Sequence, residues 1–149
     1  MIQVKWIRAL GALVMWCATA AAQAQTATPA EKAIEYRQAV FKVVAGNFGP
    51  LAQSAQGKLE VQPAAARQYA ERLAQIAQFA GDAFPDISRE GKTRAKPEIW
   101  TERAEFDKLL KDLTDATRSL AAAKPEDFKA AVGAVGNACK ACHDRFREK

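Results

Sequence analysis

The sequence predicts an all-α protein, an antiparallel four-helix bundle, and three observations support this. Four segments carry apolar residues at the three- and four-residue spacing of amphipathic helices. Proline, glycine and helix-capping residues separate these segments. No useful length of chain alternates apolar and polar residues as a half-buried strand does, and no internal repeat is present. Four such helices, joined by short loops and one longer connection, are typical of an antiparallel bundle.

The first 24 residues are typical of a secretory signal peptide. Lys5 and Arg8 give them a basic start, and an apolar run without acidic residues follows. Ala22-Gln23-Ala24 then supplies a cleavage site of the small-x-small type. We therefore predict a cleaved leader at residues 1–24 and one exported domain at residues 25–149, about 125 residues long.

Two other fates for this leader fit its sequence less well. A permanent membrane anchor needs a longer apolar run and a basic stop, whereas small residues follow here. A lipoprotein cleavage at Cys17 needs a small residue before the cysteine, where the bulky Trp16 stands. We therefore expect no membrane association of the domain after cleavage.

Cleavage leaves few side chains that bind metals strongly. The whole chain has three cysteines, two methionines and one histidine, and the leader takes away Cys17 and both methionines. The net charge falls from +5 to +3 because Lys5 and Arg8 are lost. This charge is too small and too evenly spread to indicate nucleic-acid binding.

The first helix is predicted to begin after Thr28, its N-cap, with Glu31 completing a capping box. Its inner stripe consists of apolar residues at helical spacing, namely Ile34, Phe41, Val44, Phe48, Leu51 and Ala55. Arg37 falls on the same stripe, and a buried guanidinium group needs an anion. Gly46 and Gly49-Pro50 are expected to bend or end the helix in its last third.

Two further helices follow with a longer connection between them. The second opens at Pro63 and is expected to stop near Gly81, with a stripe of Tyr69, Leu73, Ile76 and Ala80. Residues 81–97 are irregular, and long loops of this kind often contact a ligand. The third helix begins near residues 97–101, with Trp100 at its start. Its stripe is Phe106, Leu109, Leu113, Ala116 and Leu120.

The fourth helix begins at Lys124-Pro125-Glu126-Asp127 and carries the most informative motif of the chain. Its stripe is Phe128, Val132, Val135, Cys139, Cys142 and Phe146. Cys139-Lys140-Ala141-Cys142-His143 is the attachment signature of a c-type haem. One helical turn separates the thiols, so both reach one porphyrin edge, and His143 offers an axial imidazole. The helix therefore predicts a haem in the bundle interior near the C-terminal helix.

Three alternatives to haem remain open for this motif. A thioredoxin-like redox pair would need a βαβ context, and none is visible. A zinc site would need a fourth ligand beyond two cysteines and one histidine. A disulfide is possible, although closing so short a loop gains little entropy. An exported protein whose remaining cysteines all lie in one attachment motif best fits an oxidising compartment where haem is loaded covalently.

The processed chain offers iron a strong ligand from one side only. His143 is its only histidine and no methionine remains, whereas a low-spin electron carrier usually has Met or a second His as sixth ligand. A lysine would first have to lose its proton and hydration, which an apolar seam opposes. The sixth position is therefore predicted to be vacant or to hold weakly bound water.

Several separated motifs, in the right order, resemble the cytochrome c prime family of class II c-type cytochromes. They are Ala33-Ile34-Glu35-Tyr36-Arg37-Gln38, Asn47-Phe48-Gly49-Pro50-Leu51, Lys96-Pro97-Glu98-Ile99-Trp100 and Gly136-Asn137-Ala138-Cys139-Lys140-Ala141-Cys142-His143-Asp144. The resemblance covers essentially the whole processed chain. It implies a periplasmic four-helix bundle, usually a homodimer, with one covalent high-spin haem c per chain and an open sixth position.

Residue by residue, the resemblance also implies roles for site residues. Cys139 and Cys142 match the thioether attachment points, and His143 matches the axial iron ligand. Arg37 and Gln38 match positions that contact haem from the first helix. Further candidates are Phe41 as the cap of the distal face, Thr93 and Arg94 in a haem-contacting loop, Trp100, and Arg147 on the proximal side.

Three functions are compatible with these residues. If Phe41, Val40 or Val44 covers the iron, NO and CO should enter an apolar pocket, whereas anions would lose hydration there. Sequestration of nitric oxide is therefore the leading hypothesis. Electron transfer to a periplasmic redox partner through a basic rim is the alternative. An enzyme of peroxidase or NO-reductase type is least supported, because no second histidine is available for acid–base chemistry.

Overall fold

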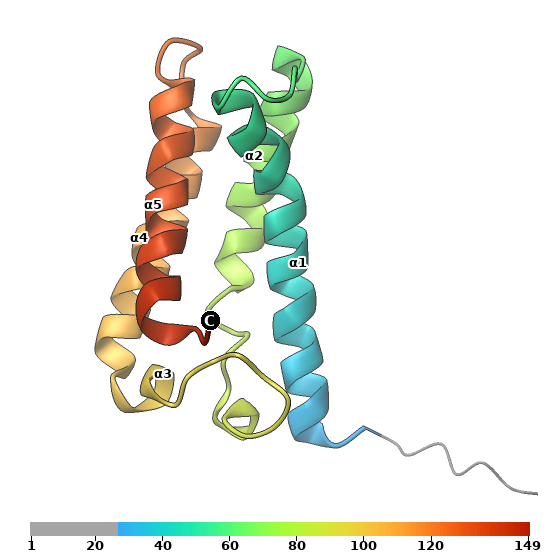
Figure 1. The fold of residues 1–149 in the computed structure, drawn as a ribbon, viewed down its shortest axis with the longest axis vertical. Coiled ribbons are helices and arrows are strands. Elements are labelled where there is room, and N and C mark those ends of the chain that lie inside the picture. The colour runs from blue at the N-terminus through green and yellow to red at the C-terminus, as the bar shows by residue number, and fades with distance from the viewer. Residues whose placement is uncertain (1–26) are drawn as a thin grey trace, which may run out of the picture.

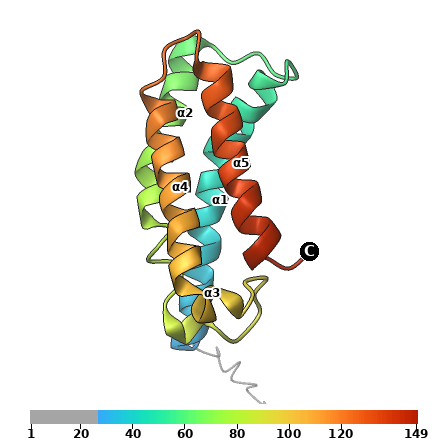
Figure 2. The ribbon, with the colours of Figure 1, turned by 90° about the vertical axis from the view of Figure 1, so that its left-hand side faces the viewer.

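The structure is a computed structural model that describes residues 27–149, so the predicted leader, with Cys17, lies outside the described residues. Its long helices are α1 (Pro29–Ala55), α2 (Pro63–Ile76), α4 (Arg103–Ala121) and α5 (Phe128–Phe146), with a short α3 (Glu98–Thr101) before α4. Figures 1 and 2 show the four long helices running side by side along the long axis. The predicted all-α four-helix bundle is confirmed.

The four long helices form a closed ring of neighbours. α1 packs against α2 and α5, and α4 packs against the same two helices. Figure 1 shows α1 and α2 on one side of the molecule and α4 and α5 on the other. Among the described residues, no helix is long and apolar enough to cross a membrane.

The start of α1 is fixed locally, as predicted. The Glu31 carboxylate accepts a hydrogen bond from the Thr28 backbone N–H at 2.7 Å, and the Thr28 hydroxyl accepts one from Glu31 N–H at 3.2 Å. Gly49-Pro50 does not end the helix, which continues to Ala55. The bond that Pro50 lacks would go to the carbonyl of exposed Gly46, which water can reach, while fully buried Leu51 anchors the next turn.

The other boundaries differ from the predicted ones by up to about five residues. α2 ends at Ile76 and continues as a 3₁₀ turn, Ala77–Phe79, before the chain turns near Gly81. A second 3₁₀ turn, Asp86–Ser88, lies in the irregular connection. The third predicted helix is interrupted at Glu102, whose φ of -117° and ψ of 44° lie outside the helical region.

The core has two parts along the bundle axis. The aliphatic part includes Val44, Leu51, Leu73, Leu113, Leu120, Val132 and Val135. The aromatic part includes Phe84, Ile99, Trp100, Phe106, Leu110 and Phe146, with Phe41 and Cys142 packed against it. The stripes of all four helices thus meet in one interior. The motif of α5 lies where the two parts meet, because Cys139 packs against the aliphatic part and Cys142 against the aromatic part.

Gly91 lies in the connecting loop, where its backbone packs close to Ile34 of α1. Its backbone φ of +126° is one that residues other than glycine rarely adopt. A Cβ at this position would lie 2.7 Å from Cδ1 of buried Ile34. Gly91→Ala is therefore expected to lower the free energy of unfolding by about 1–3 kcal/mol, mainly through backbone strain. Urea denaturation followed by circular dichroism measures this change.

Gly133→Ala, in α5, is the matched control for this prediction. A Cβ at Gly133 meets no atom within 4 Å. Because alanine favours a helix interior over glycine, the control is expected to raise the free energy of unfolding by roughly 0.5–1 kcal/mol. An unchanged urea midpoint for Gly91→Ala would contradict the assigned backbone constraint.

Candidate cofactor site

A cavity of about 600 Å³ lies between α1, α4 and α5 and is bordered by the loop around Thr93. Its volume is within the range of small-molecule and cofactor pockets. Most of its wall is apolar, formed by Phe41, Val44, Phe48, Phe84, Ile99, Phe106, Leu109, Leu110, Leu113 and Phe146. The cavity can therefore take up a large apolar group.

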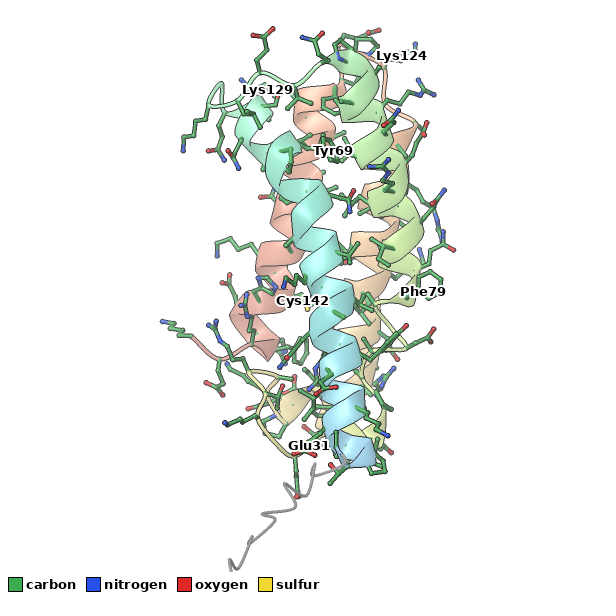
Figure 3. All side chains as sticks on the ribbon, turned by 90° about the vertical axis from the view of Figure 1, so that its right-hand side faces the viewer. Glu31, Tyr69, Phe79, Lys124, Lys129 and Cys142 are labelled. Carbon is green, nitrogen blue, oxygen red and sulfur yellow. The ribbon has the colours of Figure 1, made fainter. Side chains whose placement is uncertain are left out.

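The last turns of α5 bring the Cys-x-x-Cys-His motif to this cavity. Cys139, Cys142 and His143 all line it, and the label in Figure 3 locates Cys142 between α1 and α5. The helical spacing of the two thiols places them on one face, as the sequence predicts. Both thiols are free.

The environment of the two thiols does not suit a redox pair. Burial raises the pKa of Cys139. Burial and then the neighbouring Cys139 raise the pKa of Cys142 to about 11. Reactive dithiols have a lowered pKa, because the thiolate is the nucleophile. These thiols are therefore protonated at neutral pH in the protein alone, which disfavours the thioredoxin-like alternative.

A zinc site at the motif finds no support in the geometry. Over residues 27–149, no three side chains of the His, Cys, Asp and Glu types come together as a potential metal site. A structural zinc ion needs four such ligands. The motif therefore has no partner residues for the zinc alternative.

His143 is suited to ligation as a neutral imidazole. Partial burial lowers its pKa first, followed by the positive charges of Arg147 and Arg94, while Asp144 acts in the opposite direction. A metal-binding histidine must be unprotonated at the ligating nitrogen. The cavity wall therefore favours the protonation state that an axial ligand needs.

Arg37 is the buried cation that its place on the α1 stripe predicts. It is 5% exposed and donates hydrogen bonds to the Ser88 hydroxyl at 2.8 Å, the Ser88 carbonyl at 3.4 Å and the Thr93 hydroxyl at 2.8 Å. Burial lowers its pKa. No carboxylate between residues 27 and 149 forms an ion pair with it.

The missing counter-ion of Arg37 is the observation that tests whether this site fits a haem. Arg37 lines the cavity, and its charge is compensated only by neutral acceptors. A buried charge without a counter-ion is costly. A haem carries two propionates, so the apolar wall, the paired thiols, the neutral imidazole and the uncompensated cation together fit that group.

The C-terminal tail borders the cavity beside His143. Ala95 and Arg147 form an antiparallel bridge, Lys96 N–H donates to the Phe146 carbonyl at 3.0 Å, and Glu148 N–H donates to the Arg94 carbonyl at 2.8 Å. The Arg94 guanidinium also donates to the Glu148 carbonyl at 2.7 and 3.1 Å. The loop and the tail therefore hold each other at the cavity mouth.

Most residues predicted for the site lie together. Those that line the cavity are Arg37, Gln38, Phe41, Thr93, Arg94, Cys139, Cys142, His143 and Arg147. Trp100 does not line it. The centroid of its ring lies 6.0 Å from the Arg37 guanidinium, and its buried indole N–H has no hydrogen-bond partner. Val40 is also buried but outside the lining.

Phe84, Ser88 and Lys42 are among the residues at or near the cavity that were not predicted from the sequence. Phe84 lines it, Ser88 holds Arg37, and Lys42 stands at its edge. Phe84 and Ser88 belong to the irregular connection, where no helical period marks buried positions. Lys42 directly follows Phe41 on α1, and its position next to this predicted site residue is the only feature of the sequence that could have indicated it.

A four-helix bundle whose interior cavity carries a Cys-x-x-Cys-His motif defines a class of protein, the bundle-type c cytochromes. The family model for Cytochrome C' matches residues 32–147. A cytochrome c' of Rubrivivax gelatinosus is 39% identical over 122 residues, covering 78% of this chain and 95% of the relative. The chain belongs to the cytochrome c' family, whose members are haem proteins and not enzymes.

Solved structures agree with this assignment. The Rubrivivax gelatinosus protein has a TM-score of 0.76 at 36% identity, covering 83% of this chain and all of that one. Cytochrome c prime from Shewanella frigidimarina has a TM-score of 0.78 at 30% identity, with the same coverages. A nitric oxide complex of a cytochrome c prime mutant from Alcaligenes xylosoxidans has a TM-score of 0.73 at 31% identity, covering 80% and 97%.

Proposed function

We propose that this chain is a periplasmic c-type haem protein that binds NO and CO at an open iron position. Cys139 and Cys142 would hold one haem c per chain covalently, and His143 would ligate its iron. One observation carries the proposal: the motif lines an apolar cavity whose lining holds no methionine and no second histidine. Iron held there has one strong protein ligand.

The residues of the chain determine what can enter this cavity. When bound, haem supplies an iron that coordinates diatomic ligands and changes its oxidation state. Phe41 and Val44 present apolar surface from α1. Neutral diatomics lose little hydration there, whereas anions lose much. The nitric oxide complexes of the Alcaligenes xylosoxidans relatives support the same ligand class for this chain.

Arg37 has a separate task in this proposal. Its guanidinium is fixed by Ser88 and Thr93 before any anion arrives. A fixed planar fork suits a carboxylate. Arg37 therefore binds a haem propionate, with Gln38 beside it on the cavity wall. This contact orients the cofactor and supplies the missing counter-ion.

Absorption spectra of the reduced protein, with and without NO and CO, test the proposed function. The expected result is a high-spin ferrous spectrum that changes on addition of either gas. A low-spin six-coordinate spectrum in the absence of added ligand would refute the open position. A mature product without bound haem would refute the cofactor assignment itself.

The periplasmic location is part of the same proposal. It rests on the leader at residues 1–24, on the family, and on a motif that needs an oxidising compartment. The intact mass of the purified protein should correspond to a chain beginning at Gln25 plus one haem. A product that retains residues 1–24 would contradict export by this leader.

Electron transfer is the second candidate function, and the charges at the cavity favour it. The exposed side chains of Lys42, Arg94 and Arg147 line the cavity, whereas no aspartate or glutamate does. Such a rim attracts anionic partners at a rate that falls with ionic strength. Oxidation of the reduced protein by ferricyanide should therefore slow as salt is added. A rate that does not depend on salt would argue against a basic docking rim.

We also propose that the protein forms a homodimer through the outer face of α1 and α2. Tyr36 and Val43 lie seven residues apart on α1 and are 44% and 48% exposed. Phe79, after α2, is 50% exposed and projects outward in Figure 3. A dimer would cover this apolar surface. In analytical ultracentrifugation, Val43→Glu should convert a dimer into a monomer without loss of haem; a monomeric parent protein would refute the dimer.

A further inference from the structure

Four phenylalanine rings form a continuous chain through the aromatic part of the core. Phe41 and Phe84 meet edge to face at 5.8 Å between ring centroids, with an interplanar angle of 67°. Phe84 and Phe106 follow at 4.7 Å, and Phe106 and Phe146 at 5.3 Å. This row of rings thus runs from the cavity wall on α1 to the end of α5.

Phe84 is the ring of this series that contacts Phe41, and it is buried. It is 7% exposed, and the Arg37 guanidinium lies 5.1 Å from its ring centroid. Its backbone N–H donates to the Gly81 carbonyl at 3.4 Å, and its carbonyl accepts from Arg103 at 3.5 Å. The ring is therefore held between Arg37 of α1 and Phe106 of α4, and its backbone is anchored in the irregular connection.

Phe41 itself is held less firmly. Its side chain is only partly buried, because one side of it faces the cavity. Between residues 27 and 149, Phe84 is its only aromatic partner. Edge-to-face pairs are strong enough to change the balance between two ring orientations about two- to tenfold. The orientation of Phe41 therefore depends on Phe84.

We propose that Phe84 is a positioning residue for gas binding, because it holds the Phe41 ring over the distal side of the cavity. This inference rests on the proposed function, in which Phe41 covers the open iron position. Removing the Phe84 ring leaves space into which Phe41 can turn. The distal side then opens more often, and a diatomic ligand enters faster.

The test compares the CO association rate of four haem-loaded proteins after flash photolysis: the parent, Phe84→Leu, Phe41→Leu and the double variant. Phe84→Leu is expected to raise the rate about two- to tenfold. In the Phe41→Leu background, the same substitution should have no further effect, because the ring that it positions is gone. The infrared CO stretching band should broaden or split in Phe84→Leu alone, reporting a second orientation of Phe41.

Leu73→Ala is the control for general loosening of the bundle. Leu73 is fully buried in the aliphatic part of the core and does not line the cavity. The Leu73→Ala substitution should lower the free energy of unfolding without changing the CO association rate or the infrared band. If Phe84→Leu does not fold, Phe84→Met keeps the volume without the ring edge and tests the same contact.

The outcomes separate the two proposals. An unchanged CO rate in Phe84→Leu, with a raised rate in Phe41→Leu, would overturn the positioning role and leave the proposed function intact. Additive effects in the double variant would also overturn it, since Phe84 would then act independently of Phe41. A parent protein that binds haem but not CO would overturn the proposed function and this inference with it.

Discussion

Replacing Cys139 and Cys142 together by serine is expected to abolish covalent haem attachment. These are the only cysteines of residues 25–149, and serine cannot form the thioether bond. Haem content per chain should fall from one to none, measured by the pyridine haemochrome assay after extraction with acidified solvent. Each single substitution should retain one thioether, so its haem should still resist extraction.

The same double variant is expected to lose its rigid fold. At about 24 cal/mol per Å³, an unfilled cavity of about 600 Å³ costs on the order of 14 kcal/mol. This figure is an upper limit because the mouth is open to water, yet it equals the whole stability of an ordinary domain. Near-ultraviolet circular dichroism and the cooperativity of urea unfolding should therefore collapse while some helical signal persists.

Cys17→Ser provides the matched control for this prediction. Cys17 is the third cysteine of the chain and lies in the predicted leader. Its substitution should leave haem content, fold and the mass of the mature product unchanged. Haem that stays bound to the Cys139→Ser, Cys142→Ser double variant after acid extraction would contradict the assigned attachment points.

The parts of the fold that depend on neighbouring residues in the chain were predictable. The capping box of Thr28 and Glu31 is a local hydrogen-bond pair, and the structure contains it. The buried face of α1, including Arg37, follows from helical phase alone. Local rules were insufficient at Pro50, where packing of Leu51 into the core outweighs one missing backbone hydrogen bond.

The parts of the site that depend on tertiary contact were not predictable in the same way. Cys139, Cys142 and His143 carry a motif with its own chemistry, so their place at the cavity could be expected. Phe84 and Ser88 lie in an irregular segment without periodicity, and only their contacts to Arg37 give them a role. Trp100 is the opposite case. It belongs to a motif of the family resemblance and was predicted for the site, but it does not line the cavity.

Replacing Arg37 by leucine is expected to give the second large effect, a loss of stability in the haem-loaded protein. The substitution leaves a propionate without its buried counter-ion and removes three hydrogen bonds to Ser88 and Thr93. Ser88 still donates to the Pro85 carbonyl and Thr93 still accepts from Ala95, so the loop is only partly released. The expected decrease in the free energy of unfolding is about 2–4 kcal/mol.

Arg37→Lys separates the charge of this residue from its geometry. Lysine keeps the positive charge but cannot hold Ser88, Thr93 and a carboxylate with one planar fork. If the charge dominates, the reduction potential of Arg37→Lys should stay near that of the parent, whereas Arg37→Leu should lower it, because a nearby cation favours the reduced iron. Urea unfolding followed by the haem absorption band, together with a redox titration, measures both quantities. Equal stability and equal potential in Arg37→Leu and the parent would mean that no propionate reaches Arg37, since an anion that lost its buried cationic partner could not leave both values unchanged.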